Sequence, residues 1–429
     1  MPVTLYPAAS GVPTLTASRA VVSNAAGGLA VATTTSTEIG YVAGATSNIQ
    51  AQIDAIAPAA ATGTIIRVAA NAVPTGYIRC HRTPVSRTTY ANLFSTCNVR
   101  YGAGDGSTTF GLPTPAYELN RLQNTASALG TATTEFAMTL LSDGRVLMIG
   151  GLQTATTNQT FLGTLNPNAT VTWTASTAYP ANLKGLRAAT LNDGNVIVVG
   201  GNSGAADVNT VTIGTISGDA ITWTGSDALP TTRTYGGFTK LTDGRVLYIG
   251  GSSGGVGQST TYFGSVSGTT TTWSAGSAAS EIISYPGLVC LDDNTLVLMG
   301  GTTGATYTNH VFKGVISAST TITWTALTAL AANNYAGSCT LLDDGRILII
   351  GGYNGSATVN AMYMGTPAAD RSDVKWSTIA NMVYPTTIDS AGSAVMSDGR
   401  VLTTGGKNTA GTKQTITYLL DFIQSVIKT

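Results

Sequence analysis

Asp143-Gly-Arg-Val-Leu-Met-Ile-Gly-Gly151 is the first of six copies of one phrase, a turn followed by a short apolar strand and a double glycine. The other copies occupy residues 193–201, 243–251, 293–301, 344–352 and 398–406. Successive copies begin 50, 50, 50, 51 and 54 residues apart. One such unit cannot bury both of its apolar faces alone. The six copies are therefore predicted to stack into a closed ring, a six-bladed β-propeller over residues 117–429.

A period of this length with a double glycine after an apolar strand resembles kelch repeats, so the predicted fold class is mainly β, with a kelch-type propeller. Each repeat is predicted to contain four strands. The first leads into the Asp-Gly turn, which suits a tight hairpin, and the second, such as 246–249, is apolar on both faces. The third carries a glycine in five repeats, and the fourth carries a tryptophan in the same five: Gly163 with Trp173, Gly214 with Trp223, Gly264 with Trp273, Gly314 with Trp324 and Gly365 with Trp376.

Six hairpins but only five tryptophans raise the question of how the ring closes, because an open ring leaves two unprotected sheet edges. Residues 119–125 lie at the distance before the first hairpin where other repeats have their tryptophan strand. We predict that this segment pairs onto the last blade. The alternative is the C-terminus, because 426–429 also lies in register with 221–224.

Composition excludes several functional classes. Only 10% of the 429 residues are charged, with 21 Lys+Arg against 21 Asp+Glu, so no broad electrostatic footprint favours nucleic acid or an anionic membrane. No apolar run has the length of a membrane span, and the first residues lack the pattern of a secretion signal. We therefore expect synthesis in a cytoplasm. Cys290 and Cys339 are expected to be small buried apolar residues, and the spacing of Cys80 and Cys97 leaves their redox state open.

The first third of the chain has a different character. Residues 1–62 are rich in Ala, Thr and Ser and cannot form a monomeric core. The stretch 15–30 resembles the shaft segments of bacteriophage tail fibres. The stretches 73–80, 85–94 and 101–113 resemble the phage tail collar domain, although His81-Arg82 replace the Asp-Gly that usually follows the cysteine. The expected domains are a shaft and attachment segment at 1–62, a collar-like α+β domain at 63–116, and the propeller at 117–429.

The resemblance implies a virion protein that is assembled in the host cytoplasm. It implies a homotrimeric tail fibre, attached through its N-terminal region to phage tail or baseplate proteins. The propeller would then be outermost and would contact a glycan or protein on the host cell surface. The expected function is receptor binding, with a purely structural fibre cap and a glycan-degrading enzyme as alternatives.

No catalytic residue, metal site or cofactor is predicted. The chain has only two histidines, His81 and His310, so a copper site with two imidazoles cannot form within one propeller. The Asp-Gly-Arg repeats are expected to be structural, with Asp in the turn and Arg at a solvated tip. A glycan hydrolase would need a close acid pair, and the acids of the predicted loop face, Asp207, Asp227, Glu281 and Asp389, are scattered over several repeats.

A recognition surface is predicted on one face of the ring, where the loops between blades and the loops after the double glycine emerge. Variable loops on a rigid scaffold are a usual place for recognition. Tyr235, Tyr285 and Tyr335 come eight or nine residues before the turn aspartate in consecutive repeats. A phenol suits a sugar ring, whereas packing of the blade junctions is the alternative. The predicted contacts are Tyr179, Arg187, Arg233, Tyr235, Tyr285, Tyr307, Asn334, Tyr335, Tyr353, Asn354 and Tyr384. Arg233 is the residue expected to pair with an acidic sugar.

Overall fold

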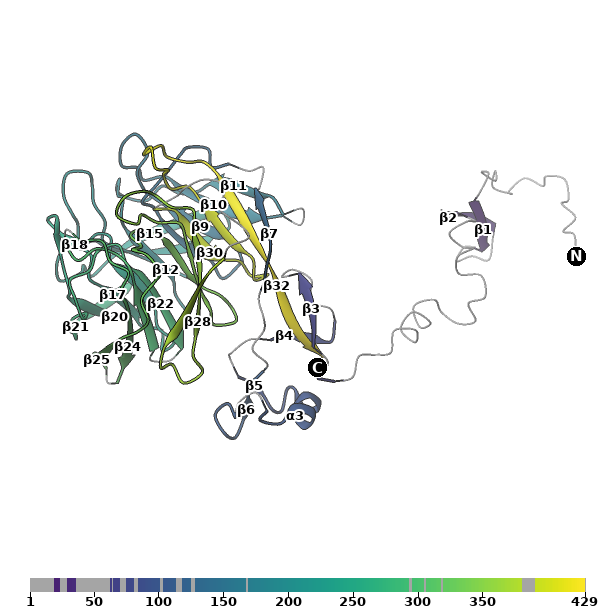
Figure 1. Ribbon diagram of the computed structural model, residues 1–429. Coiled ribbons are helices and arrows are strands. Elements are labelled where there is room, and N and C mark those ends of the chain that lie inside the picture. Colours follow the sequence, from purple (N-terminus) through teal and green to yellow (C-terminus); the bar gives the residue numbers. More distant parts are fainter. Residues whose placement is uncertain are drawn as a thin grey trace, which may run out of the picture. The chain divides into compact units, whose positions relative to one another are not determined.

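The computed structural model describes residues 19–23, 29–35, 62–63, 65–69, 75–80, 84–100, 103–112, 118–124, 128–166, 169–292, 295–304, 306–317, 319–379 and 390–428. The chain divides into two compact units, Met1–Thr64 and Ile65–Thr429. In the first unit, β1 (Arg19–Ser23) pairs antiparallel with β2 (Leu29–Thr35). The second unit contains six sheets that form the blades of a β-propeller (Figure 1).

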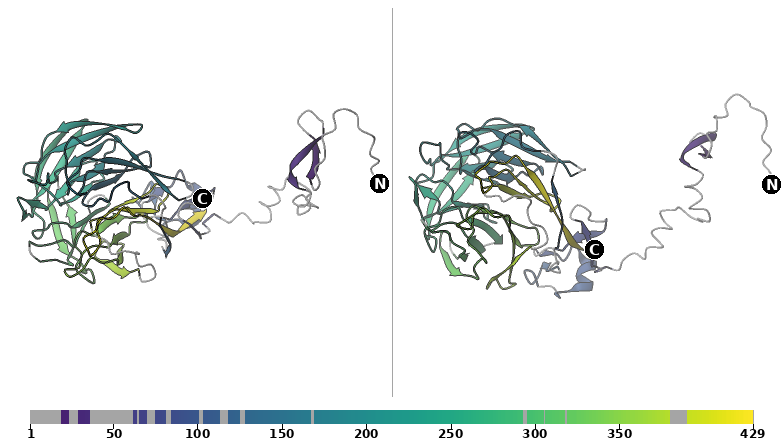
Figure 2. Two further views of the ribbon diagram at one scale, coloured as in Figure 1. Left: turned by 90° about the horizontal axis from the view of Figure 1, so that it is seen from above. Right: turned by 45° about the horizontal axis from the view of Figure 1, so that its top comes forward.

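Five blades are four-stranded antiparallel sheets, and they surround a common centre (Figure 2). The first blade consists of β8 (Ala137–Leu140), β9 (Val146–Ile149), β10 (Thr160–Leu165) and β11 (Val171–Ala175). The second consists of β12 (Arg187–Thr190), β13 (Val196–Val199), β14 (Val211–Ser217) and β15 (Ala220–Ser226). The third consists of β16 (Gly237–Lys240), β17 (Val246–Ile249), β20 (Thr261–Ser267) and β21 (Thr270–Gly276), with an added hairpin of β18 (Ser252–Ser253) and β19 (Val256–Gly257).

The next two blades repeat this order. The fourth consists of β22 (Gly287–Asp292), β23 (Thr295–Met299), β24 (Val311–Ile316) and β25 (Ile322–Ala326). The fifth consists of β26 (Ser338–Leu341), β27 (Ile347–Ile350), β28 (Met362–Pro367) and β29 (Val374–Thr378). The predicted four-stranded repeats and the six-bladed propeller are thus confirmed.

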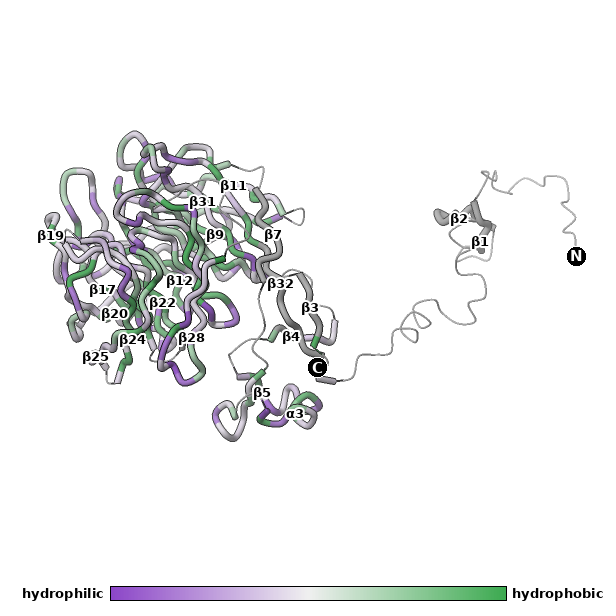
Figure 3. The backbone as a smooth tube through the Cα atoms, in the orientation of Figure 1, coloured by the Kyte–Doolittle hydropathy of each residue, from purple (hydrophilic) through white to green (hydrophobic). Residues whose placement is uncertain are grey.

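The second strand of each blade is buried on both faces, as its sequence predicts. In β13, Val196 and Val198 pack towards the first blade, whereas Ile197 and Val199 pack towards the third. The same alternation recurs around the ring and produces a separate apolar core between each pair of neighbouring blades. Hydrophobic residues accordingly follow the strands (Figure 3). The propeller is therefore stabilised by apolar contacts between sheets rather than by a single central core.

The last blade combines both ends of the propeller sequence. It contains β30 (Gly392–Val395), β31 (Val401–Thr404), the first half of β32 (Thr417–Lys428), and β7 (Glu118–Asn124) as its outermost strand. β7 runs antiparallel to β32, with partners from Tyr418↔Asn124 to Ile423↔Glu118. The N-terminal latch predicted at 119–125 is confirmed for the described residues 118–124. The C-terminal alternative is wrong, because residues 426–428 pair elsewhere.

The second half of β32 joins the propeller to the collar region. Its residues pair with β3 (Ile65–Ala69) on one side and with β4 (Tyr77–Arg79) on the other. One continuous strand therefore belongs to both the sixth blade and the collar sheet. The rest of the collar region contains β5 (Val85–Ser86), the helix α3 (Ala91–Cys97) and β6 (Thr109–Phe110). The described helices include none with the length and apolar character that crossing a membrane requires.

The four cysteines are free thiols. Cys80 is buried in the small collar core, against which half-buried Cys97 packs. In the propeller, the residues Cys290 and Cys339 are partly buried. Burial of the Cys339 thiol raises its pKa to about 12. All four thiols thus contribute to packing, and the expectation of small apolar residues fits Cys339 best.

A second device closes the ring at its centre. The residue eight positions before each turn aspartate has a positive φ of 53–63°, and its N–H donates to the carbonyl of the equivalent residue in the preceding blade. These six residues are Glu135, Gly185, Tyr235, Tyr285, Ala336 and Ser390. The bond from Glu135 to Ser390, at 3.2 Å, completes the circle. This central ring fixes the six blades relative to one another.

The Asp-Gly turns differ in burial, which corrects one expectation. The side chains of Asp143 and Asp243 are 45% and 50% exposed, as expected for a solvated tip. By contrast, Asp344 is fully buried and pairs with Arg346, whose side chain is only 10% exposed. Arg400 of the sixth blade is also buried, with 7% of its side chain exposed. The prediction that Arg lies at a solvated tip is therefore wrong for the fifth and sixth blades, and a buried ion pair holds the fifth-blade turn.

The third-strand glycines are explained by the neighbouring tryptophans. Each glycine pairs with the tryptophan of the fourth strand, as in Gly214↔Trp223, and the indole lies over it. A Cβ at Gly214 would lie 2.5 Å from the Trp223 ring. The repeated glycine thus makes room for the repeated tryptophan.

We expect Gly214→Ala to destabilise the propeller by about 1–3 kcal/mol, because the added methyl overpacks this site. Gly225 lies in the same blade, and a Cβ there would meet nothing within 4 Å. Gly225→Ala is therefore the matched control and should leave stability unchanged or slightly raised. Urea denaturation midpoints of the two variants measure the difference, and equal midpoints would contradict the packing explanation.

Candidate functional site

The loops of four consecutive blades surround a basin of about 1380 Å³. Its lining comes from the loops after the second strands, within 152–156, 202–207, 252–257 and 302–307, and from the loops between blades, including Lys184, Thr234 and Ser284. Both predicted sets of loops therefore meet on one face. We call this cavity the loop-face basin.

Tyrosines form the floor of the loop-face basin. The rings of Tyr235 and Tyr285 stack with centroids 4.0 Å apart and planes 16° apart, and Tyr335 lies 4.3 Å beyond Tyr285. Tyr307 contacts Tyr335 and Tyr353 edge to face at 5.4 and 5.1 Å. Tyr235, Tyr285 and Tyr335 come together because the loops before the first strands converge at the ring centre, whereas Tyr307 and Tyr353 belong to loops after the second strands. Four of the five line the basin, the exception being Tyr353.

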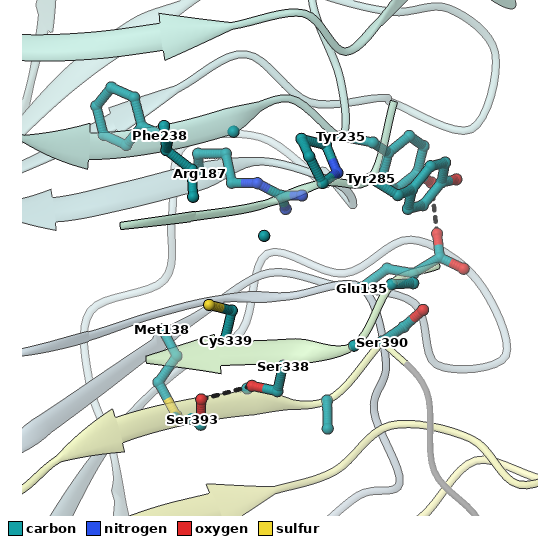
Figure 4. Close-up of a pocket in the computed structure, with 18 of the residues that line it drawn as sticks. Glu135, Met138, Arg187, Tyr235, Phe238, Tyr285, Ser338, Cys339, Ser390 and Ser393 are labelled. Atoms are coloured by element: carbon teal, nitrogen blue, oxygen red, sulfur yellow. Dashed lines mark hydrogen bonds between the residues drawn. The ribbon is translucent and has the colours of Figure 1, made fainter. Parts of the chain in front are cut away.

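A carboxylate anchors one end of the tyrosine row. The Tyr235 hydroxyl donates to Glu135 Oε2 at 2.5 Å (Figure 4). Lys184 Nζ lies 3.2 Å from the same oxygen. Burial, and then the Glu135 charge, raise the pKa of Tyr235 well above its usual value. Burial and the neighbouring Tyr235 likewise raise the pKa of Tyr285, whose hydroxyl also interacts with that of Tyr335. These phenols stay protonated and act as hydrogen-bond donors at neutral pH.

A second cavity, of about 190 Å³, lies in the central channel, and Tyr235 and Tyr285 line it as well as the basin. Arg187, at the start of β12, lines this channel and not the basin. Its Nε donates to the Gly236 carbonyl at 2.6 Å and its Nη1 to that of Leu186 at 3.2 Å. The structure thus places Arg187 beneath the tyrosine floor, because it belongs to an innermost strand, and the expectation of a loop-face contact is wrong.

Three further predicted contact residues are buried. Tyr179 packs in the core between the first two blades, and its hydroxyl donates to Thr212 Oγ1 at 3.0 Å. Arg233 is 2% exposed and donates to the Thr232 carbonyl and to Thr260 Oγ1. Asn334 donates through Nδ2 to the Gly351 carbonyl at 2.8 Å. Their contact roles are wrong because these loop positions tie neighbouring blades together, and Arg233 is not available to an acidic sugar.

The remaining predicted contacts need a finer placement. Ala336, and not Tyr335, is the fifth-blade equivalent of Tyr235 and Tyr285, because the central ring uses the residue eight positions before the turn. Tyr335 lies one residue earlier and forms an isolated bridge with Tyr353. Asn354 Oδ1 accepts from the N–H groups of Ser356 and Ala357 and shapes its own loop. Tyr384 lies outside the described residues.

Sequence reasoning placed Asp207 on the loop face but missed Glu135 and Lys184. Glu135 belongs to the first blade and Lys184 to the second, so no local motif marks the pair. Asp207 accepts from Asn202 Nδ2 at 2.7 Å and from the Gly254 N–H at 2.8 Å, which fixes the β18–β19 hairpin. One signal was available, since Glu135 precedes Asp143 by the same eight residues that separate Tyr235 from Asp243.

Other acids of this face are also engaged. Glu281 contacts His310 Nδ1 at 3.0 Å, so the propeller histidine has an ordinary surface partner. Within the described part of the chain, no group of three or more His, Cys, Asp or Glu side chains could hold a metal ion. The chemistry displayed in the basin is therefore aromatic and hydrogen-bonding.

Comparisons with known proteins add two findings. Residues 63–114 match the family model described as Phage Tail Collar Domain, close to the expected 63–116. The solved "Structure of YjhT" is similar over 68% of this chain and 95% of that chain, with a TM-score of 0.56 and 14% identity, and this likeness supports the propeller fold alone. No curated protein sequence matches the chain significantly. The chain therefore carries a phage tail collar domain followed by a six-bladed β-propeller, and the collar domain indicates a component of a phage tail.

Proposed function

We propose that this chain is a phage tail fibre protein whose propeller binds a receptor on the host cell surface, and that this receptor is a saccharide. The observation that carries the proposal is a large basin with a tyrosine floor on the loop face of a propeller that follows a tail collar domain. Aromatic rings with polar tips suit sugars, which present apolar ring faces and hydroxyl groups together.

The tyrosines divide into supporting and contacting residues. Tyr285 has a neighbouring tyrosine on either side, Tyr235 and Tyr335. Tyr235 also packs closely over Gly185, where a Cβ would lie 2.4 Å from its ring. Tyr235 and Tyr285 therefore support the floor. We assign Tyr307 and Tyr335 as the principal contacts, because both are half-buried and line the basin. Tyr353 packs edge to face against Tyr307 and supports it.

Tyr307→Ala combined with Tyr335→Ala should weaken binding to host cells at least tenfold, because aromatic anchors dominate many binding energies. The full-length chain, labelled and titrated on host cells, provides the measurement. Tyr179→Phe is the matched control, since it removes only a hydroxyl from a buried tyrosine that does not line the basin. Unchanged binding by a folded double variant would eliminate this contact assignment.

The proposal includes a homotrimer that is attached to the phage tail or baseplate through the N-terminal region. Three propellers on one fibre would raise a weak single-site affinity through effective concentration. Native mass spectrometry of the full chain should give three times the 43.6 kDa chain mass. A monomer at micromolar concentration would rule out the trimer without affecting the basin.

Glycan degradation is the competing function. A hydrolase needs two carboxylates across the scissile bond. In the described basin region, Glu135 is paired with Lys184 and Tyr235, Asp207 holds Asn202 and the hairpin, and Glu281 contacts His310. This engagement favours binding over turnover. Release of reducing ends from host polysaccharide by the full chain would decide for the enzyme.

A further inference from the structure

The loop-face basin has little free charge. Among its described lining residues, Lys184 and Asp207 are the charged ones. Lys184 is paired with Glu135 at 3.2 Å, and both Asp207 oxygens accept hydrogen bonds. The segment 380–389, which lies outside the described residues, contains neither Lys nor Arg in its sequence. No described basin cation is therefore left over for an acidic sugar.

One side of the loop-face basin is instead apolar. Four large hydrophobic residues are strongly exposed in the described chain, and two of them are Val256 at 63% and Ile282 at 48%. Val256 lines the basin. Ile282 is not a basin-lining residue, but its Cγ2 would lie 2.7 Å from a Cβ at Gly257, the lining residue next to Val256. We call Val256 and Ile282 the aliphatic rim.

The aliphatic rim is held in place. Asp207 binds the Gly254 N–H at the tip of the β18–β19 hairpin, and the hydroxyls of Thr232 and Ser253 lie 2.7 Å apart. The hairpin is an addition found in the third blade and in none of the other described blades. Exposed Val256 on this braced hairpin and exposed Ile282 in the adjoining loop between blades offer apolar surface that an apolar substituent would cover.

We propose that the loop-face basin selects a neutral sugar that carries a methyl group, either on a deoxy carbon or in an acetyl substituent. The tyrosine floor contacts the sugar ring, and the aliphatic rim contacts the methyl group. This inference rests on the proposed saccharide receptor and adds its chemical class. It also replaces the acidic sugar expected from Arg233, which is buried.

A glycan panel with matched pairs tests the inference on the labelled full-length chain. The pairs are a 6-deoxyhexose with its 6-hydroxy parent, N-acetylglucosamine with glucose, and glucuronate with glucose. Burial of one methyl group corresponds to about fourfold in affinity. We expect a preference of this size for the methyl-bearing member of one of the first two pairs, which also identifies the methyl source, and weaker binding of glucuronate.

Variants of the aliphatic rim separate this inference from the proposed function. Val256→Ser with Ile282→Ser should abolish the methyl preference, whereas Val99→Ser, at an exposed valine in the collar region, should preserve it. Sugar binding with no methyl preference, or with a preference that survives the double variant, overturns this inference alone. Binding to host cells with no sugar bound overturns the saccharide proposal and this inference together, and points to a protein receptor.

Discussion

Replacing residues 118–124 by a Gly/Ser segment of equal length should lower the melting temperature of the propeller by on the order of 10 °C. The native segment β7 forms six residue pairs with β32 and is the outermost strand of the last blade. Loss of these ladder bonds costs roughly 5 kcal/mol, at about 1 kcal/mol for each bond. It also exposes the edge of β32, which invites association with other chains.

A control is Val256→Ser in the β18–β19 hairpin, which lies outside the four-stranded sheets and whose other residues are already Gly or Ser. That replacement should leave the melting temperature nearly unchanged. The latch variant should still fold at low temperature, because Glu135, Thr133 and Leu129 also bind the last blade through backbone hydrogen bonds. A latch variant that melts like the wild type would show that these central contacts alone close the ring.

Asp344→Ala should cost about 3–5 kcal/mol of folding stability, because it removes one member of a buried ion pair and keeps the Arg346 charge in place. The Asp344 side chain is fully buried, and its Oδ2 accepts from Arg346 Nε at 2.5 Å. The equivalent Asp243→Ala removes the same turn bond from a side chain that is 50% exposed. Loss of the exposed ion pair in Asp243→Ala should add no more than about 1 kcal/mol to the cost of losing the turn hydrogen bond.

A double variant separates the charge from the turn. Asp344→Ala with Arg346→Met removes both charges, and replacement of a buried ion pair by apolar groups is often neutral or stabilising. We therefore expect the double variant to recover much of the loss in urea denaturation. Equal losses for Asp344→Ala and Asp243→Ala would show that burial of the pair has no energetic consequence.

Repetition made the fold predictable from the sequence. Three features recur at a fixed spacing: a second strand that is buried on both faces, a hairpin dipeptide, and a glycine opposite a tryptophan. Each is a local requirement of a stacked sheet. The latch segment 119–125 was predictable for the same reason. Six hairpins but only five tryptophan strands showed that one blade lacked its fourth strand, and 119–125 has the spacing of that strand. The collar domain was expected because three short stretches resemble a known family, and the family model matches residues 63–114.

Only the tertiary structure decided which loop residues reach the basin. Tyr179, Arg233 and Asn334 lie in the expected loops, but neighbouring blades bury them. Tyr335 resembles Tyr235 in the sequence and also lines the basin, yet a shift of one residue excludes it from the central ring and pairs it with Tyr353. The physical reason is that sequence spacing fixes a residue's place within its own blade. Exposure and partners depend on the adjacent blade, which lies about fifty residues away in the chain.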